Sequence, residues 1–313
     1  MRDDDYLWDK SGPADPEVER LEAVLAGFRA APAVAPRRRA RRWLAPAMAT
    51  ASILAAAAAV ILLVVRREPI VAPRFPIPGW KVDSVAGAPS CGQEPCAELR
   101  PGEWLETRSA DRARVAVADI GEMEVAPDSR LRLVSTGASG HRLELARGTI
   151  SARVVAPPRL LIVNTPVIAA VDLGCAYTLT VEADGATRIE VTSGWVALES
   201  AHRATFVPAG ASARARAATG PGLPVYRDAT ARFRAAADIL DQGPDSAATT
   251  SLLAEARVQD ALTVWHLIPR VAGPDRGRVI SRLATLAPPP AGVTAEAAAG
   301  LDPTALDTWR QHL

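Results

Sequence analysis

Few residues in this sequence have types and spacings that could carry out chemistry, and the cysteines are the first of them. Cys91 and Cys96 enclose a four-residue loop. Structural zinc needs four ligands and no histidine lies near, so this pair makes a poor zinc site. In an oxidising compartment the pair can close a small disulfide loop, and in a reducing one both remain free thiols. Cys175 stands alone in an apolar stretch, and we expect it to be a small buried hydrophobic residue.

The other groups used in catalysis are scattered. None of the four histidines lies at metal-ligand spacing from a cysteine or a carboxylate: His141, His202, His266 and His312. Ser139 lies among turn-forming glycines rather than in a Gly-x-Ser-x-Gly motif, and no glycine-rich phosphate loop precedes a helical pattern. Glu122 and Glu124 share one face of a predicted strand, and we expect both to be solvated. The sequence therefore predicts no enzyme, no cofactor and no metal site.

Composition adds little about partners. The 313 residues carry a formal net charge of +1, which gives no reason to expect binding to nucleic acid. Almost all basic residues are arginine, and with the many alanines this bias is typical of a GC-rich genome, so we give it no functional weight. Proline is frequent, with 26 residues, and aromatic residues are few, which indicates linkers and a modest core.

Residues 44–65 form an uncharged, apolar stretch. At about 1.5 Å per residue they give a helix of roughly 33 Å, enough to cross a hydrocarbon core of about 30 Å. A buried core helix is the alternative interpretation of the same stretch. We predict one transmembrane helix. A cleaved signal peptide fits poorly, because some forty residues precede the stretch and no small-x-small site follows Val65.

The charges beside this stretch predict its orientation. Five arginines precede it, and only two follow: Arg37, Arg38, Arg39, Arg41 and Arg42, against Arg66 and Arg67. The positive-inside rule then places the N-terminus in the cytoplasm and the C-terminal part outside it. The five arginines could also touch anionic membrane lipid, but their role as a topology signal explains them. We predict a single-pass protein of the inner (cytoplasmic) membrane with a periplasmic C-terminal domain.

Residues 1–36 form the predicted cytoplasmic tail, with eight acidic and four basic residues. Asp15-Pro16 is a good helix start, because the carboxylate can cap and proline suits the first turn. One face of this helix is apolar, formed by Val18, Leu21, Leu25 and Phe28, with Glu19, Arg20 and Glu22 opposite. A tail this short cannot bury that stripe alone. The stripe must meet a protein partner, a second copy of itself or the bilayer.

The rest of the chain changes pattern three times. Residues 68–96 are proline-rich and predict an extended linker. Residues 97–217 alternate apolar and polar residues, as at Val115 and Val117, and turn residues separate the runs: Pro127-Asp128, Gly137 to Gly140, Arg147-Gly148, Pro157-Pro158, Asp184-Gly185 and Ser193-Gly194. This predicts a mainly β domain of many short strands, a sandwich, barrel or solenoid-like fold.

Residues 224–313 have helical periodicity and predict a small C-terminal helical domain. We expect a first helix from Tyr226 to about Asp241 and a second from about Ala247 to Leu267. A third should start at Pro274, and a last short helix at Asp302-Pro303. Whether this domain binds a partner or caps the β domain is open at this point.

Residues 164–199 resemble the periplasmic domain of the FecR family of bacterial envelope signalling proteins. The resemblance rests on a Thr-Pro before an apolar strand, a glycine turn, an aromatic strand, a hairpin and a closing Gly-x-Val: Thr165-Pro166, Gly174, Tyr177, Asp184-Gly185 and Gly194-Trp195-Val196. Asp172-Leu173-Gly174-Cys175 departs from the Arg-Gly-Thr usual there. The resemblance implies a protein that relays an envelope signal to an extracytoplasmic-function sigma factor, as an anti-sigma factor or co-regulator.

Two hypotheses about function follow. In the first, the exported domain senses a partner, whose identity the sequence does not give, and the tail regulates a sigma factor. The apolar face of the tail helix, together with Trp8, would then contact that factor, and its acidic face would steer toward a basic surface. In the second, the protein is a non-catalytic envelope scaffold that binds through its exported β and helical domains.

Overall fold

The computed structural model describes residues 79–92 and 94–313. The described residues all belong to one compact unit, Pro73–Leu313. The predicted tail helix, the arginine flank and the predicted transmembrane helix at 44–65 therefore lie outside the described residues. No helix in the described part of the chain has the length and apolarity needed to cross a membrane.

The β part consists of two sheets that share one long strand, β9 (His141–Val154). The first sheet contains these strands in spatial order: β1 (Trp80–Ala86), β6 (Arg112–Val117), β7 (Gly121–Val125), the second half of β9, β12 (Ala176–Val181), β13 (Thr187–Ser193) and β16 (Ala211–Arg216), with β17 (Gly220–Pro221) and β18 (Val225–Tyr226) along its edge. β4 (Glu98–Leu99) pairs with β1. All these pairings are antiparallel.

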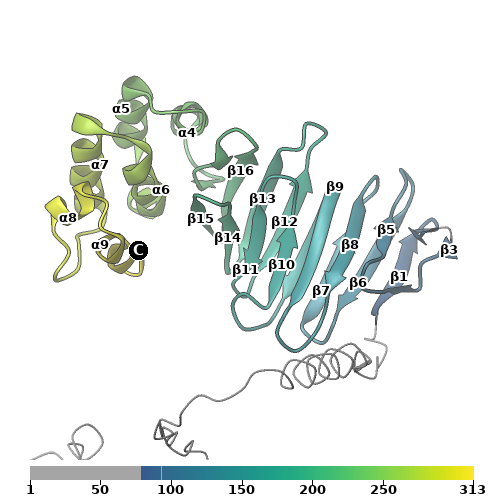
Figure 1. Cartoon of the computed structure of the whole chain (residues 1–313). Coiled ribbons are helices and arrows are strands. Elements are labelled where there is room, and N and C mark those ends of the chain that lie inside the picture. The colour runs from purple at the N-terminus through teal and green to yellow at the C-terminus, as the bar shows by residue number, and fades with distance from the viewer. Residues whose placement is uncertain (1–78, 93) are drawn as a thin grey trace, which may run out of the picture. The chain divides into compact units, whose positions relative to one another are not determined.

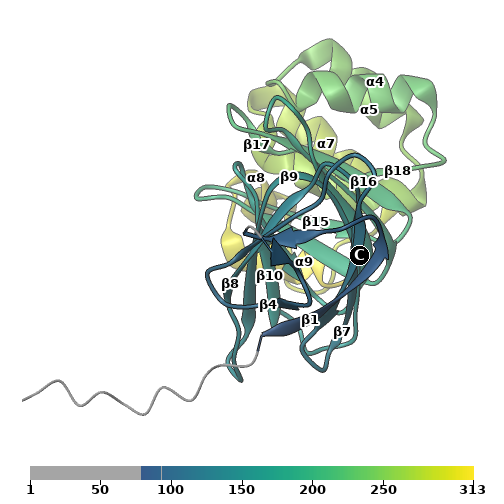
Figure 2. The ribbon, with the colours of Figure 1, turned by 90° about the vertical axis from the view of Figure 1, so that its right-hand side faces the viewer.

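The second sheet contains, again in spatial order, β3 (Glu94–Pro95), β2 (Ser90–Cys91), β5 (Trp104–Glu106), β8 (Arg130–Ser135), the first half of β9, β10 (Leu161–Asn164), β11 (Ala169–Asp172), β14 (Trp195–Glu199) and β15 (Ala204–Pro208). Its pairings are antiparallel except β9 with β10. Figure 2 shows the two layers, with β7 and β16 on one side and β8 and β10 on the other. The predicted fold of many short strands is confirmed, with its two sheets packed as a sandwich.

The core lies between the two layers because side chains alternate along each strand. Leu143 and Leu145 enter it from the first half of β9, and Ile150, Ala152 and Val154 from the second half. The polar neighbours of these residues face outward. The hairpin predicted at Asp184-Gly185 joins β12 to β13, and Gly185 has the positive φ that such a turn needs.

β9 changes sheets at Gly148. Arg147 still pairs with Arg130 of the second sheet, whereas Gly148 already pairs with Val181 of the first. Gly148 has φ +88°, and a Cβ atom there would lie 2.4 Å from the Cα of Ser129. The Arg147-Gly148 turn signal in the sequence is therefore a bend within one strand rather than a strand end.

The described part of the predicted linker 68–96 differs from the prediction. Residues 80–96 contribute β1, β2 and β3, and Trp80 and Val82 are buried in the core. The physical reason is that Trp80 and Val82 alternate with Lys81 and Asp83, which is a strand pattern. Pro89 lies just after this strand, where it breaks no hydrogen bond of the sheet.

The C-terminal region is helical, as predicted, and lies beyond β14, β15 and β16 (Figure 1). Its helices are α4 (Ala231–Leu240), α5 (Ser246–Glu255), α6 (Ala261–Leu267), α7 (Gly273–Leu286), α8 (Ala295–Ala299) and α9 (Pro303–Arg310), with single 3₁₀ turns at Val258–Asp260 and Ile268–Arg270. Side-chain oxygens cap four of the N-termini: Thr230, Asp245, Thr294 and Asp302. These helices enclose a second core around Phe233, Leu252 and Trp309.

The predicted helix from about Ala247 to Leu267 is wrong in one respect, because it is two helices. α5 ends at Glu255, and Ala256 has extended backbone with ψ 127°. The Asp260 carboxylate then accepts hydrogen bonds from both the backbone N–H and Nε of Arg257, which holds a separate turn. A local side-chain bond of this kind competes with helix continuation.

Candidate functional site

The helical region meets the β sandwich at β15, the edge strand of the second sheet. The backbone N–H of Phe206 on β15 donates to Nε2 of His266 on α6 at 3.0 Å. The Arg310 guanidinium of α9 lies 4.3 Å from the centre of the Phe206 ring. An edge strand presents unpaired backbone groups, and this helix covers one of them. Burial, with the nearby Arg270 and Arg310, lowers the pKa of His266 to about 3, so this imidazole is neutral.

A buried ion pair of the helical region also forms hydrogen bonds with the β sandwich. Nη1 of Arg270 lies 3.1 Å from Oδ1 of Asp241, and the two side chains are only 4% and 7% exposed. The other guanidinium nitrogen, Nη2, donates to the Pro221 carbonyl at 2.9 Å. The same Asp241 oxygen also accepts from the backbone N–H of Leu223 at 2.7 Å. The Asp241 carboxylate, at the end of α4, thus binds two other segments. These are the connection between β17 and β18, through Leu223, and the turn after α6, through Arg270.

Burial dominates the ionisation of this pair. It raises the pKa of the Asp241 carboxyl to about 6, although the charge of Arg270 acts in the opposite direction. It also lowers the pKa of Arg270 to about 10. Desolvation of two charges therefore outweighs their attraction, as is common for buried ion pairs. At neutral pH both groups are nevertheless charged.

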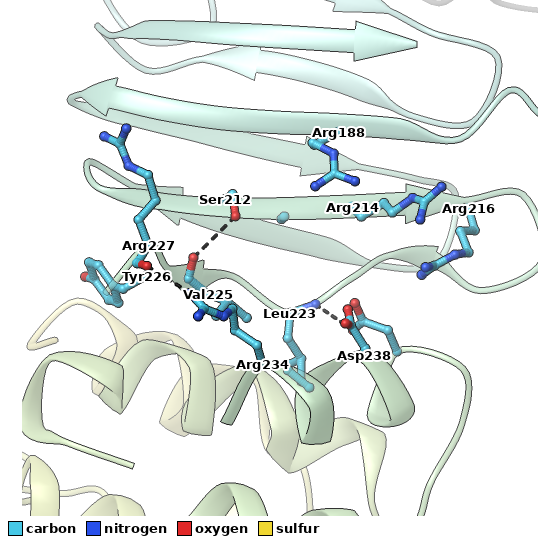
Figure 3. Close-up of a pocket in the computed structure, with 13 residues that line it drawn as sticks. Arg188, Ser212, Arg214, Arg216, Leu223, Val225, Tyr226, Arg227, Arg234 and Asp238 are labelled. Carbon is cyan, nitrogen blue, oxygen red and sulfur yellow. Dashed lines mark hydrogen bonds between the residues drawn. The ribbon is translucent and has the colours of Figure 1, made fainter. Parts of the chain in front are cut away.

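Beside this pair lies a pocket of about 320 Å³, between β13 and β16 on one side and α4 on the other (Figure 3). Its charged lining consists of five arginines and two aspartates: Arg188, Arg214, Arg216, Arg227, Arg234, Asp238 and Asp241. Leu223, Val225, Tyr226 and Ala237 add an apolar part of the wall. The pocket is therefore a small, partly apolar hollow with an excess of positive charge.

The strand pattern places three of these arginines on one face. Arg214 and Arg216 lie two residues apart on β16, and Arg188 on β13 pairs directly with Arg214. Like charges at directly opposite positions repel. The Glu182 carboxylate offsets this repulsion, because it forms ion pairs with both Arg188 and Arg214.

The remaining arginines form no ion pair within 4.0 Å in the described part of the chain, although the charge of Arg216 acts at longer range on Asp241. Arg216 and Arg227 form no side-chain ion pair or hydrogen bond with any residue from 79–92 or 94–313. Arg234 donates from Nη1 to the Arg227 carbonyl at 2.9 Å, which fixes it without neutralising it. Guanidinium groups suit carboxylate and phosphate oxygens, so this lining favours negatively charged groups.

Comparison with known proteins identifies the central part of the chain. Residues 103–197 match the FecR protein family. These residues form a FecR domain. It begins just before β5 and ends within β14, so it includes Arg188 of the pocket. The other four pocket arginines come after the FecR domain in the chain.

Two crystal structures of a candidate anti-sigma factor from Parabacteroides distasonis, at 1.65 and 2.50 Å resolution, are similar to this chain. Each shares 15% sequence identity with it, with a TM-score of 0.36, over 42% of this chain. The chain covers 63% and 62% of those two structures, just under two thirds of their length. No curated protein matches the chain.

The residues singled out in the sequence fall in different places. Trp8, Val18, Leu21, Leu25 and Phe28, with the arginines from Arg37 to Arg42, lie outside the described residues. Cys91 and Cys96 are joined by a disulfide. No group of three or more histidine, cysteine or acidic side chains in the described ranges is arranged to hold a metal ion.

The turn that departs from the FecR pattern has its own hydrogen bonds. The Asp172 carboxylate accepts from the backbone N–H of Gly174 at 2.7 Å and from the Cys175 thiol at 2.8 Å. Cys175 is buried, and burial together with Asp172 raises the pKa of its thiol far above the ordinary value. This cysteine is therefore a protonated, structural residue of the FecR domain.

Sequence reasoning missed the pocket arginines. From the sequence alone, the arginine content is attributed to genome composition, yet Ser212, Arg214 and Arg216 alternate with buried alanines and so mark the outer, half-buried face of a strand. This alternation is visible in the sequence and could have predicted that Arg214 and Arg216 share one face. The approach of Arg227 and Arg234 to this face depends on how α4 packs, which no local pattern shows.

Proposed function

We propose that this protein is a single-pass membrane signalling protein. Its exported FecR domain receives a signal, and its N-terminal tail regulates an extracytoplasmic-function sigma factor in the cytoplasm. The observation that carries the proposal is the FecR domain at residues 103–197. We further propose that the protein acts by binding rather than by catalysis.

The order of segments in the sequence supports the proposal. An uncharged stretch at 44–65 lies between a short tail and the FecR domain, and its arginine-rich side faces the tail. The tail itself offers an apolar stripe that it cannot bury alone. A sigma factor in the cytoplasm would provide a surface to cover this stripe, as grooves do for amphipathic helices.

A substitution in the stripe tests the proposal. Leu21→Asp and Leu25→Asp each replace an apolar contact with a charge, and burying one leucine contributes about 2 kcal/mol. We expect each to weaken sigma-factor capture by the tail by about tenfold or more. In cells, transcription from the promoter of that sigma factor should move to the level of a strain that lacks residues 1–36. Co-purification with co-encoded sigma factors and a promoter reporter measure these two effects.

Arg20→Gln is the matched control, because it changes the charge by the same amount on the opposite face of the helix. It should retain capture and transcription near the wild-type values. If Leu21→Asp and Leu25→Asp leave both readouts unchanged, and loss of residues 1–36 leaves function intact, the envelope-scaffold hypothesis is favoured instead.

A further inference from the structure

We propose that the arginine-lined pocket between β16 and α4 binds a small, multiply charged oxyanion, with its negative charges carried by phosphate or carboxylate groups. The proposal deepens the sensing role proposed above and rests on it only for the biological meaning of the ligand. Binding itself is measured without a sigma factor, so failure of one proposal is distinguishable from failure of the other.

The charge balance of the pocket supports an anionic ligand. Glu182 forms ion pairs with Arg188 and Arg214, and Asp241 forms an ion pair with Arg270. Arg216, Arg227 and Arg234 remain as cations without an ion-pair partner among the described residues. Clustering such cations raises the free energy of the empty pocket, and an anion lowers it. Asp238 is an exposed acidic residue of the lining, so it opposes an anion only weakly through solvent.

The positions of these arginines indicate more than one charge on the ligand. In Figure 3, Arg227 and Arg216 lie toward opposite ends of the pocket, and Arg234 reaches from α4 between them. A single monovalent anion would contact only part of this set. An elongated ligand with two or three separated oxyanion groups would contact all three guanidinium groups, which bind such oxygens strongly.

The size and the apolar wall limit the ligand to a small molecule or a short segment. About 320 Å³ lies at the lower end of the range for ligand pockets, roughly 300–1,000 Å³. Val225 and Tyr226, which are half-buried, can contact a short carbon chain that links the charged groups. The pocket walls belong to the β sandwich and to α4, and the Asp241–Arg270 pair lies at one edge. A ligand in the pocket would therefore contact both the β sandwich and α4 where the two meet.

Two probes distinguish the sources of negative charge: inorganic tripolyphosphate for phosphate, and triglutamate for carboxylate. The experiment titrates each into the full chain in a non-ionic detergent and measures heat by isothermal calorimetry. We expect at least one probe to bind at 50 mM salt with a Kd on the order of 10–100 μM. Because the contacts are exposed charges, the affinity should fall several-fold at 300 mM salt.

Arg216→Gln and Arg227→Gln each remove one guanidinium that has no described partner, so both variants should fold and melt like the wild type. Each should weaken binding by about tenfold, because a charge-assisted hydrogen bond is lost. Arg112→Gln is the matched control, since this exposed arginine of β6 is also unpaired within the described ranges but lies far across the same sheet. It should leave the Kd unchanged.

Binding of tripolyphosphate alone assigns the site to phosphate, and binding of triglutamate alone assigns it to carboxylate. Either result, with loss in the two pocket variants, supports the proposal. The proposal is overturned if neither probe binds the wild type below about 1 mM at 50 mM salt. It is also overturned if Arg112→Gln weakens binding as much as the pocket variants do.

Discussion

Asp241→Ala is expected to lower the free energy of unfolding by about 3 kcal/mol or more, because breaking a buried ion pair on one side leaves the other charge without a partner. Arg270 is 4% exposed and would keep hydrogen bonds to Pro221 and Thr205 but lose its carboxylate. The buried N–H of Leu223 would lose its acceptor as well. Urea unfolding of the full chain in non-ionic detergent, followed by near-UV circular dichroism, measures the change.

Asp241→Asn separates the lost charge from the lost acceptor. Asparagine keeps a carbonyl oxygen for Leu223 and Arg270 and removes the desolvation cost of the carboxylate, so we expect the free energy of unfolding to change by less than about 1 kcal/mol at pH 7. The double variant Asp241→Ala with Arg270→Met removes both charges and should recover much of the stability lost in Asp241→Ala. Equal stability of wild type and Asp241→Ala would contradict the role given to this pair.

The difference in the free energy of unfolding between wild type and Asp241→Asn has a defined pH dependence. The pKa of Asp241 is raised to about 6 in the folded protein, above the ordinary value of 3.8. The folded state therefore binds a proton more readily than the unfolded state. The proton-linked part of this carboxyl's contribution to stability is complete below about pH 4 and is lost as the pH rises through 6, whereas its hydrogen bond to Leu223 remains. Between those values the wild type should gain on Asp241→Asn by at most about 1.4 kcal/mol per pH unit of acidification.

Gly148→Ala should lower the free energy of unfolding by about 3 kcal/mol or more, from backbone strain and from overpacking together. Gly148 has φ +88°, and the added Cβ would meet the buried Ser129 at both Cα and Oγ. Ser129 cannot yield easily, because Oγ accepts from the backbone N–H of Thr149. The bend by which β9 joins the two sheets depends on the close approach of Gly148 to Ser129. The same urea unfolding experiment measures the effect.

Gly102→Ala is the matched control for Gly148→Ala. Gly102 also has a positive φ, +91°, but a Cβ atom there would meet nothing within 4 Å. Its substitution should cost about 1 kcal/mol, from backbone strain alone. If both glycine variants lose the same amount, close packing at the β9 bend contributes nothing, and the account of that strand is wrong.

The regular parts of the fold were predictable because they depend on neighbouring residues. Alternation predicted the short strands, and Asp184-Gly185 predicted a hairpin. Asp302-Pro303 predicted the start of α9, where the Asp302 carboxylate does accept from Ala305 N–H. The irregular parts of the fold, such as the bend in β9, were not predictable in this way. A glycine signal is the same whether a strand ends or bends, so β9 could not be recognised as one strand that serves two sheets.

The candidate site was less predictable than the fold. Alternation along β16 places Arg214 and Arg216 on one face, but their neighbours Arg227 and Arg234 arrive through the packing of α4. The partner of Asp241 lies 29 residues away in the chain. Such pairs depend on tertiary structure, and the single sequence contains no local pattern that relates them.

The central claim is that a membrane separates the tail from the FecR domain, and alkaline phosphatase fusions test it most directly. This reporter is active only where its disulfides form, outside the cytoplasm. A fusion after Leu313 should give high activity in intact cells, and a fusion after Pro36, before the five arginines, should give background activity. Background activity after Leu313, with the fusion protein present at normal level by immunoblot, would contradict the claim.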